Sequence, residues 1–363
     1  MPNTIGGALP IADIFSRRWF LEIPEYQRDY AWDANESLQL IKDFQEELKL
    51  HSQSQTEPSY YLGTIILALV DQPSRSGDLA TAEIVDGQQR LATLTIFMAC
   101  LRDLQPQGAR KDALDRLITS PHQTPPTPSK FVLSLRGFDG EFLCKSVQYD
   151  GATLLSVRRK ATTRRAIVAV REAIQKFLTK LGPSERDALA DFIMAACRVA
   201  VVTTRNRDQA WRIFGRVNQR GKRLRTSDIL KAVIIGALPQ SVRPHYVAMW
   251  DKWKQALGAD FDGEVVGRRY LFSYIAELGG REGNILDSVI AQIQHHGAAA
   301  FMDNVFEPVA RAFVTVNKQQ FNDGTDAQRQ QIAASLKQLS WQPDDGWIIV
   351  AILLIHRLST PIS

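Results

Sequence analysis

The chain has 363 residues and a net charge of +5; hydrophobic residues make up 45% of it and charged residues 23%. This length and balance are typical of a soluble globular protein with two or more domains and a sizeable core. No apolar run approaches the length of a membrane span, and the N-terminus lacks the basic start and apolar core of a signal peptide. A cytoplasmic protein without a membrane partner is therefore expected.

Strand and helix signals alternate over the first 155 residues, which predicts a mixed α/β domain there. The apolar periods and turn residues predict these elements in chain order: a helix around Ile11–Phe15, a strand at Trp19–Ile23, a helix at Asn35–Leu50, a buried strand at Tyr60–Leu69, a strand ending at Val85, a helix through Leu91–Leu101, a proline-rich loop at Thr119–Ser129, a strand at Phe131–Arg136 and a helix at Phe138–Val147.

Strand signals become sparse after residue 155, and helical periods predominate. The expected helices are Arg165–Leu181, Pro183–Cys197, Gln209–Val217, Ser227–Leu238, Pro244–Leu257, Arg268–Leu278, Ile285–His295, Ala327–Leu339 and Trp347–Leu358. Ala200–Thr204 is the clearest late strand. We therefore expect an α+β fold, with domain 1–155 followed by a mainly α-helical, basic domain at 156–363.

The cysteines and histidines do not form a metal or disulfide pattern. Cys100, Cys144 and Cys197 are far apart, odd in number and each in an apolar context, which predicts reduced core thiols. The pair His295-His296 is more typical of a helix surface than of a metal site.

The motif Asp86-Gly87-Gln88-Gln89-Arg90 separates a strand from a helix. Asp-Gly breaks the strand, and the helix start presents unpaired N–H groups and a positive dipole end, which suit a phosphate. Arg90 adds a fixed positive fork, and the two glutamines add neutral donors and acceptors. On this motif alone, an ordinary strand-to-helix connection with a solvated first turn stays an equal alternative.

A second motif, IPEYQRDYAW, crowds aromatic residues around an arginine just after a proline. The rings of Tyr26, Tyr30 and Trp32, with Arg28 and Gln27 beside them, could grip a base or a ribose by stacking and hydrogen bonding. The alternative is a loop that anchors its rings in the core, with the arginine paired to a neighbouring carboxylate.

Positive charge is concentrated in the middle of the chain. Residues 155–235 contain 14 Arg and 5 Lys against 6 Asp and Glu, a net charge of +13, so the rest of the chain is net acidic. The segment FGRVNQRGKRLRTSDILK places five of these basic residues in one short loop. Because a guanidinium binds phosphate bidentately, the excess of arginine favours a nucleic-acid partner over helices with solvated basic faces.

Four motifs together resemble one family. IPEYQRDYAW, YYLGTIIL, IVDGQQRLATLT and FGRVNQRGKRLRTSDILK occur in the order and spacing of the DGQQR-motif domain, over about the first 235 residues. That domain resembles the ParB/sulfiredoxin nucleotide-binding fold and is found in GmrSD-type modification-dependent restriction proteins. The N-terminal part looks most similar to the phosphorothioate-sensing anti-phage effectors of the SspE type.

The resemblance implies that the turn binds and hydrolyses a nucleoside triphosphate, GTP or ATP with GTP favoured, together with Mg²⁺. Asp86, Gln88, Gln89 and Arg90 would be catalytic: Arg90 would hold phosphates, a glutamine would orient the attacking water, and Asp86 would position Arg90 or Mg²⁺. The further nucleotide-binding residues implied are Arg28, Gly87, Thr93, Asn218, Arg220, Lys222 and Asp228. No dedicated set of metal ligands is identified, and no P-loop motif is present.

The resemblance also implies double-stranded DNA, phosphorothioate-modified, as the partner. Modification sensing would fall to Tyr26, Gln27, Tyr30 and Trp32, with Tyr30 as the apolar contact for the softer sulfur-bearing anion. The DNA backbone would be held by Arg158, Arg159, Lys160, Arg164 and Arg165.

The function predicted in this way is a DNA-modification sensor with nucleoside triphosphatase activity that controls a nuclease in anti-phage restriction. No HNH arrangement occurs before Ser363, so we expect a nuclease domain in a longer protein. Two alternatives stay open: a ParB-like DNA clamp switched by nucleotide, and a nucleotide-independent DNA-binding module. The sequence leaves the oligomeric state, including a homo-oligomer, undecided.

Overall fold

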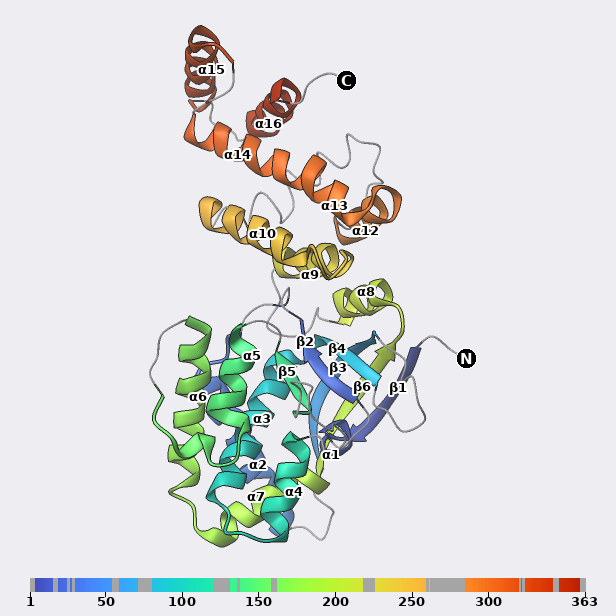
Figure 1. Cartoon of the computed structure of the whole chain (residues 1–363), viewed down its shortest axis with the longest axis vertical. Helices are drawn as coiled ribbons and strands as arrows, with labels where there is room; N and C mark the ends of the chain where they lie inside the picture. Colours follow the sequence, from blue (N-terminus) through green and yellow to red (C-terminus); the bar gives the residue numbers. More distant parts are fainter. Residues whose placement is uncertain are drawn as a thin grey trace. The chain divides into compact units, whose positions relative to one another are not determined.

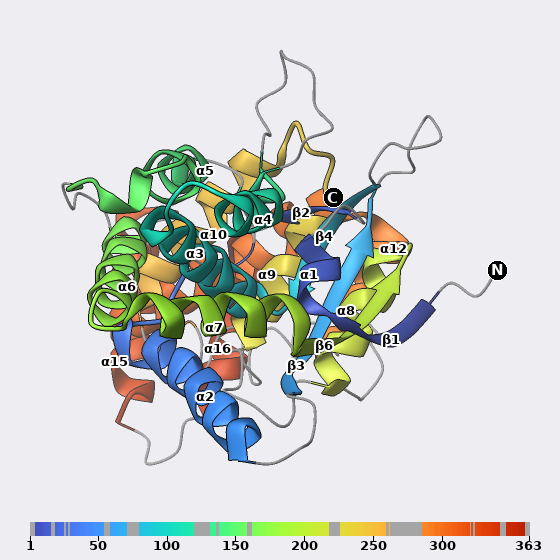
Figure 2. The same ribbon diagram turned by 90° about the horizontal axis from the view of Figure 1, so that it is seen from below.

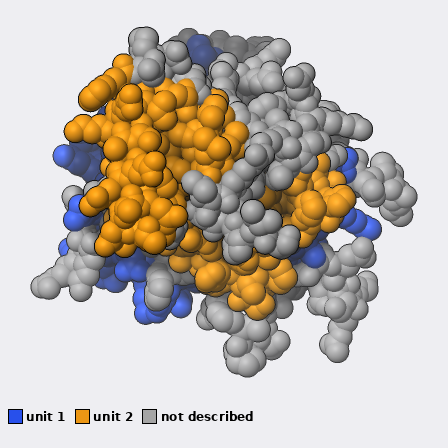
Figure 3. Space-filling model, turned by 90° about the horizontal axis from the view of Figure 1, so that it is seen from above, with its two compact units in different colours: residues 1–214 blue, residues 215–363 orange. Residues whose placement is uncertain are grey.

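A computed structural model gives the fold of the chain (Figure 1). It describes residues 4–15, 19–24, 27, 30–53, 59–70, 80–119, 131–135, 138–157, 162–217, 226–258, 261, 285–319, 321, 324–341 and 346–359. The chain divides into two compact units, residues 1–214 and residues 215–363 (Figure 3).

The first unit is built on a six-stranded mixed sheet with the strand order β1-β6-β3-β4-β2-β5. Neighbouring strands are parallel for β2–β4, β2–β5 and β3–β6, and antiparallel for β1–β6 and β3–β4. The strands are β1 (Thr4–Pro10), β2 (Trp19–Ile23), β3 (Tyr60–Leu69), β4 (Ala80–Asp86), β5 (Leu133–Leu135) and β6 (Cys197–Thr204). The strands predicted at 19–23 and 60–69 are confirmed, whereas β1, which is short of long apolar side chains, was missed.

Helices cover one face of this sheet, as Figures 1 and 2 show from two directions. They are α1 (Ile11–Asp13), α2 (Ala34–Gln53), α3 (Gln88–Leu104), α4 (Ala109–Ile118), α5 (Phe138–Leu143), α6 (Thr162–Leu178) and α7 (Pro183–Ala195). Helix α3 is central, because it contacts α4, α6 and α7, and nearly all of its residues are buried. Its Phe97 ring meets Phe44 of α2 at 6.0 Å between centroids. The sequence missed α4.

The second unit is helical in the part that the structure describes. Its helices are α9 (Thr226–Gly236), α10 (Arg243–Leu257), α12 (Ile285–His296), α13 (Ala298–Phe301), α14 (Glu307–Lys318), α15 (Asp326–Leu339) and α16 (Gly346–Ser359). Trp250 stacks on Phe306 at 4.6 Å, and Phe261 meets both rings edge-on. The α+β fold class is confirmed; α14 was missed, and the helix predicted at 268–278 lies outside the described residues.

The boundary between the units differs from the one predicted at residue 155. Strand β6 lies between β1 and β3 in the sheet, so residues after 155 are part of the first unit. Helices α6 and α7 belong there too, because they pack on α2 and α3. A count of strand signals along the chain cannot show that a late strand inserts into the middle of an early sheet.

The cysteines and the histidine pair lie as the sequence predicted. All three cysteines are free; Cys100 and Cys197 are buried, and Cys144 is half-buried. Burial raises the pKa of the Cys100 thiol to about 12. His295 and His296 are exposed on α12. None of the described helices is both long and apolar enough to cross a bilayer.

Candidate functional site

The turn from β4 into α3 depends on a glycine. Gly87 has φ +95° and precedes the first residue of α3, and its N–H donates to Asp86 Oδ1 at 2.8 Å. A Cβ on Gly87 would lie 2.5 Å from Ile65 Cγ2, so both the backbone conformation and the space require glycine here. The turn therefore sets the first-turn N–H groups of α3 directly after the end of β4.

Arg90, in the first turn of α3, is oriented by backbone carbonyls. Its Nη1 donates to Leu62 O at 2.5 Å and its Nη2 to Thr64 O at 2.7 Å, both on β3. Its Nη2 also lies 3.7 Å from Asp86 Oδ2, and each of these two side chains is 24% exposed. Neutral carbonyls fix the direction of a guanidinium without cancelling its charge, so a positive charge stands at the start of α3.

The two glutamines of the motif are buried. Gln89 Oε1 accepts the backbone N–H groups of Ala31 at 2.8 Å and of Trp32 at 3.2 Å. Gln89 thereby holds the aromatic segment against the turn. Gln88, also buried, is the first residue of α3.

The aromatic segment and the turn form one hydrogen-bonded assembly. Gln27 Nε2 donates to Ile84 O at 3.2 Å, at the end of β4. The Tyr30 hydroxyl lies 2.7 Å from Thr93 Oγ1 and 3.4 Å from Ser37 Oγ. Two motifs separated by more than fifty residues are thus joined at three points.

Tyr30 is a core residue in this assembly. Its side chain is 3% exposed, and burial, as the largest cause, raises the pKa of its hydroxyl to about 12. A ring in this position offers no face to DNA, so the placement disfavours the sensing role predicted for Tyr30. Trp32 is half-buried against the core. Tyr26 and Arg28 lie outside the described residues.

The remaining predicted ligands are only partly described. Arg164 lies with its guanidinium carbon 5.4 Å from the centroid of the Phe142 ring, and Arg165 is exposed on α6. Asp228, on α9 of the second unit, lies 3.6 Å from Lys254 Nζ. Six predicted ligands lie outside the described residues: Arg158, Arg159, Lys160, Asn218, Arg220 and Lys222.

The sequence reading missed one ion pair close to the turn. Glu83 of β4 is 3% exposed in its side chain and accepts both Nε (2.7 Å) and Nη2 (2.5 Å) of Arg207. Because side chains alternate along a strand, Glu83 lies on the face opposite Ala82 and Ile84, which join the helical core. Arg207 begins α8 (Arg207–Val217), so the pair ties this helix to the strand that leads into the motif. A charged residue inside an apolar strand was the available signal, but the sequence does not reveal its partner.

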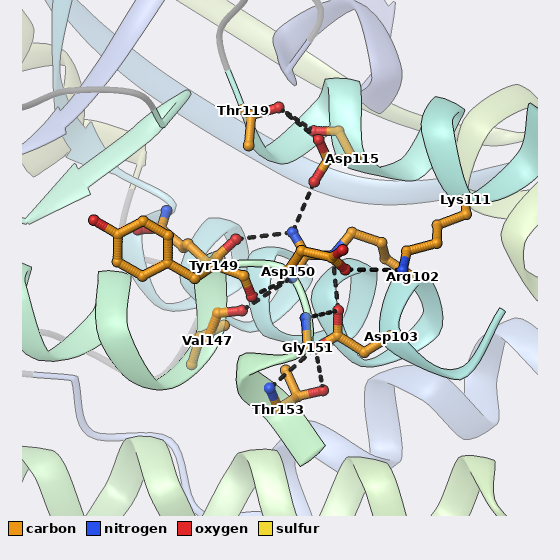
Figure 4. A network of polar contacts seen from close by, with 11 residues as sticks. Arg102, Asp103, Lys111, Asp115, Thr119, Val147, Tyr149, Asp150, Gly151 and Thr153 are labelled. Carbon is orange, nitrogen blue, oxygen red and sulfur yellow. Dashed lines mark hydrogen bonds and ion pairs between the residues drawn. The ribbon is translucent and has the colours of Figure 1, made fainter. Parts of the chain in front are cut away.

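A second charged network fixes the other end of α3 (Figure 4). Arg102 is fully buried, with Nε 2.8 Å from Asp103 Oδ1 and Nη1 2.9 Å from Asp115 Oδ1. It also donates to the carbonyls of Gln148 at 2.8 Å and Tyr149 at 2.7 Å. Since both ends of α3 are anchored, the helix is a rigid base for the turn.

The donor set suits a nucleotide with a divalent cation. Among the described residues, no group of three or more His, Cys, Asp or Glu could bind a metal ion. Mg²⁺ bound together with a nucleotide needs only one or two carboxylates, because phosphates and waters complete its shell. Asp86 fits as such a carboxylate, and the start of α3 with Arg90 fits the phosphates.

Comparison with protein families gives one match over most of the chain. Residues 11–235 match the family model described as the N-terminal domain of the GmrSD restriction endonuclease. The matched range contains all four sequence motifs and the whole turn. No curated protein matches the chain significantly.

Proposed function

Because the chain belongs to the family of GmrSD restriction endonuclease N-terminal domains, we propose that it is a nucleoside triphosphatase that reads phosphorothioate-modified DNA and controls nuclease activity. Family membership supports a role in restriction and anti-phage defence, with DNA as the substrate. The triphosphatase activity, the GTP preference and the phosphorothioate are the further steps of the proposal.

One observation carries the triphosphatase proposal: the geometry of Arg90. Its guanidinium is fixed by two carbonyls of β3 and stands beside the start of α3, with its charge uncancelled by those acceptors. Phosphoryl transfer is accelerated by positioning and by neutralising the charge that builds on the phosphoryl oxygens. A fixed cation at a helix N-terminus supplies both.

Asp86 and the two glutamines of the turn would bind Mg²⁺ and orient the attacking water. Asp86 accepts the Gly87 N–H and lies beside Arg90, and it would be the carboxylate that holds Mg²⁺, which when bound would neutralise phosphate charge. We assign the orientation of the attacking water to one of the two buried glutamines, Gln88 or Gln89, of which Gln89 also accepts two backbone N–H groups of the aromatic segment through its Oε1.

The DNA part of the proposal follows from the link between the two motifs. Gln27 and Gln89 tie the aromatic segment to the end of β4 and to α3. DNA that moves this segment therefore acts directly on the catalytic turn. Because Tyr30 is buried, the contacts with a modified phosphate fall in this proposal to Tyr26, Gln27 and Trp32.

The test is turnover of radiolabelled GTP and ATP with Mg²⁺, alone and with phosphorothioate-modified and unmodified duplexes of one sequence. We expect turnover that rises with the modified duplex and stops on chelation of Mg²⁺. Arg90→Ala should reduce it by about a hundredfold or more, the cost of losing one transition-state donor. Arg311→Ala, on the exposed surface of α14, is the matched control and should leave turnover unchanged.

The other outcomes distinguish the alternative functions. Nucleotide binding without DNA-stimulated turnover supports a nucleotide-switched DNA clamp, and DNA binding without any nucleotide binding supports a nucleotide-independent module. Either result contradicts the triphosphatase proposal.

A further inference from the structure

Strand β3 is irregular where it meets Arg90. Its parallel pairing with β6 aligns Tyr61 with Arg198 and Thr64 with Ala200, so two residues of β3 oppose one residue of β6. The extra residue belongs to a β-bulge that contains Gly63, whose φ is +92°. This region contains none of the residues of the DGQQR motif, although it touches one of them.

The bulge lies beyond the point where β4 stops pairing with β3. The antiparallel pairing ends with Ile66 opposite Asp86, and Gly87 then turns the chain away into α3. If the two strands continued to pair in this register, Thr64 would lie opposite residue 88 and Leu62 opposite residue 90. The carbonyls of Leu62 and Thr64 therefore have no β4 residue opposite them, and they accept hydrogen bonds from the Arg90 guanidinium instead.

Glycine is required for this replacement. A Cβ on Gly63 would lie 2.5 Å from Arg90 Nη1 and 3.6 Å from Arg90 Cζ. The positive φ that turns the two carbonyls toward the guanidinium is also one that other residues rarely adopt. Any side chain at position 63 would therefore displace the guanidinium, strain the bulge, or both.

We infer that Gly63 is a positioning residue for Arg90: the glycine bulge of β3 holds the guanidinium where it meets an anionic ligand at the start of α3. The inference rests on the proposed triphosphatase function and deepens it, because it extends the site to a strand outside the motif. The ligand class is the phosphate chain of a nucleoside triphosphate, and Gly63 acts on it only through Arg90.

The test compares Gly63→Ala with Gly151→Ala in the full chain. Gly151 also has a positive φ, +73°, but a Cβ there meets nothing within 4 Å, so this control carries backbone strain without a displaced neighbour. We expect Gly63→Ala to lose about a hundredfold in turnover of radiolabelled GTP, as a small misplacement of a catalytic group can. Gly151→Ala should stay within about twofold of the wild type.

A double-mutant cycle shows whether the effect passes through Arg90. Binding of radiolabelled GTP is measured for the wild type, Gly63→Ala, Arg90→Ala and the double variant, and thermal unfolding of each reports folding. We expect Gly63→Ala to weaken binding in the wild-type background and to add less than about twofold in the Arg90→Ala background.

Equal losses in both backgrounds would overturn the inference, since Gly63 would then act independently of Arg90. So would a Gly63→Ala protein that binds and turns over GTP like the wild type. A wild-type protein that neither binds nor hydrolyses nucleotide would instead contradict the proposed function itself, which separates the two failures.

Discussion

Arg90 and Arg102 stand at opposite ends of helix α3, and the fold treats their charges in opposite ways. Arg102 is fully buried, contacts Asp103 and Asp115 within 2.9 Å, and has Asp150 at 3.8 Å. Arg90 is partly exposed and is held by two backbone carbonyls. Among the described residues, the carboxylate beside it is that of Asp86, 3.7 Å away. Arg102 is thus enclosed by carboxylates and carbonyls in the interior, whereas Arg90 is oriented by carbonyls, has one carboxylate beside it and is partly exposed, so Arg90 is the arginine that can receive an anion.

The largest effect on stability is expected from Arg102→Ala. Removing this side chain takes the paired cation from buried Asp103, which keeps only the neutral donors of Gly151 and Thr153, and takes one donor from the carbonyls of residues 147–149. Breaking such a buried pair costs about 3–5 kcal/mol of unfolding free energy. Urea denaturation followed by circular dichroism measures it. Arg110→Ala, whose arginine forms half-exposed ion pairs with Asp187 and Asp191, should change stability little. Similar losses in the two variants would remove the distinction between buried and exposed networks.

Arg207→Ala should have an intermediate effect. It leaves the buried Glu83 carboxylate without the bidentate partner that it has in the fold, at a cost of about 2 kcal/mol. The double variant Glu83→Gln, Arg207→Ala should recover part of this loss, because a neutral amide is less costly to bury than a carboxylate that has lost its arginine. Denaturation of both proteins at neutral pH tests this, and a double variant less stable than Arg207→Ala would contradict it.

Arg90→Ala should lower stability less than Arg102→Ala does, by about 1–2 kcal/mol, because it removes two hydrogen bonds at a partly exposed position. The same change is expected to abolish most of the turnover. A variant with native-like unfolding and lost turnover would sharpen the contrast between the two arginines. A loss of stability as large as that of Arg102→Ala would show that Arg90 is chiefly structural.

The sequence identified the turn and the family, but not how the turn is held. Asp86 to Arg90 could be assigned to a strand-to-helix turn because the breaker and the apolar period are local signals. The partners of Arg90 on β3 and the Arg207 partner of Glu83 could not, because they depend on strand order and on contacts across 26 to 124 residues. The burial of Tyr30 could not be predicted with certainty for the same reason: from the residues alone, a core-anchoring loop was slightly favoured over a ligand contact, and the family resemblance then led to the sensing role.

The smallest effect is expected from Tyr30→Phe, which also tests the sensing role first given to that ring. The variant loses the hydrogen bond to Thr93 and about 1 kcal/mol at neutral pH. The pKa of Tyr30 is raised to about 12 in the fold, so its contribution is complete below pH 10 and is lost as the pH rises from 10 toward 12, where the unfolded tyrosine ionises first. Over that range the unfolding free energy of the wild type should fall more steeply with pH than that of Tyr30→Phe. Because the ring is buried, the variant should still distinguish modified from unmodified DNA; a loss of that preference in a stably folded Tyr30→Phe would restore its hydroxyl to the sensing contact.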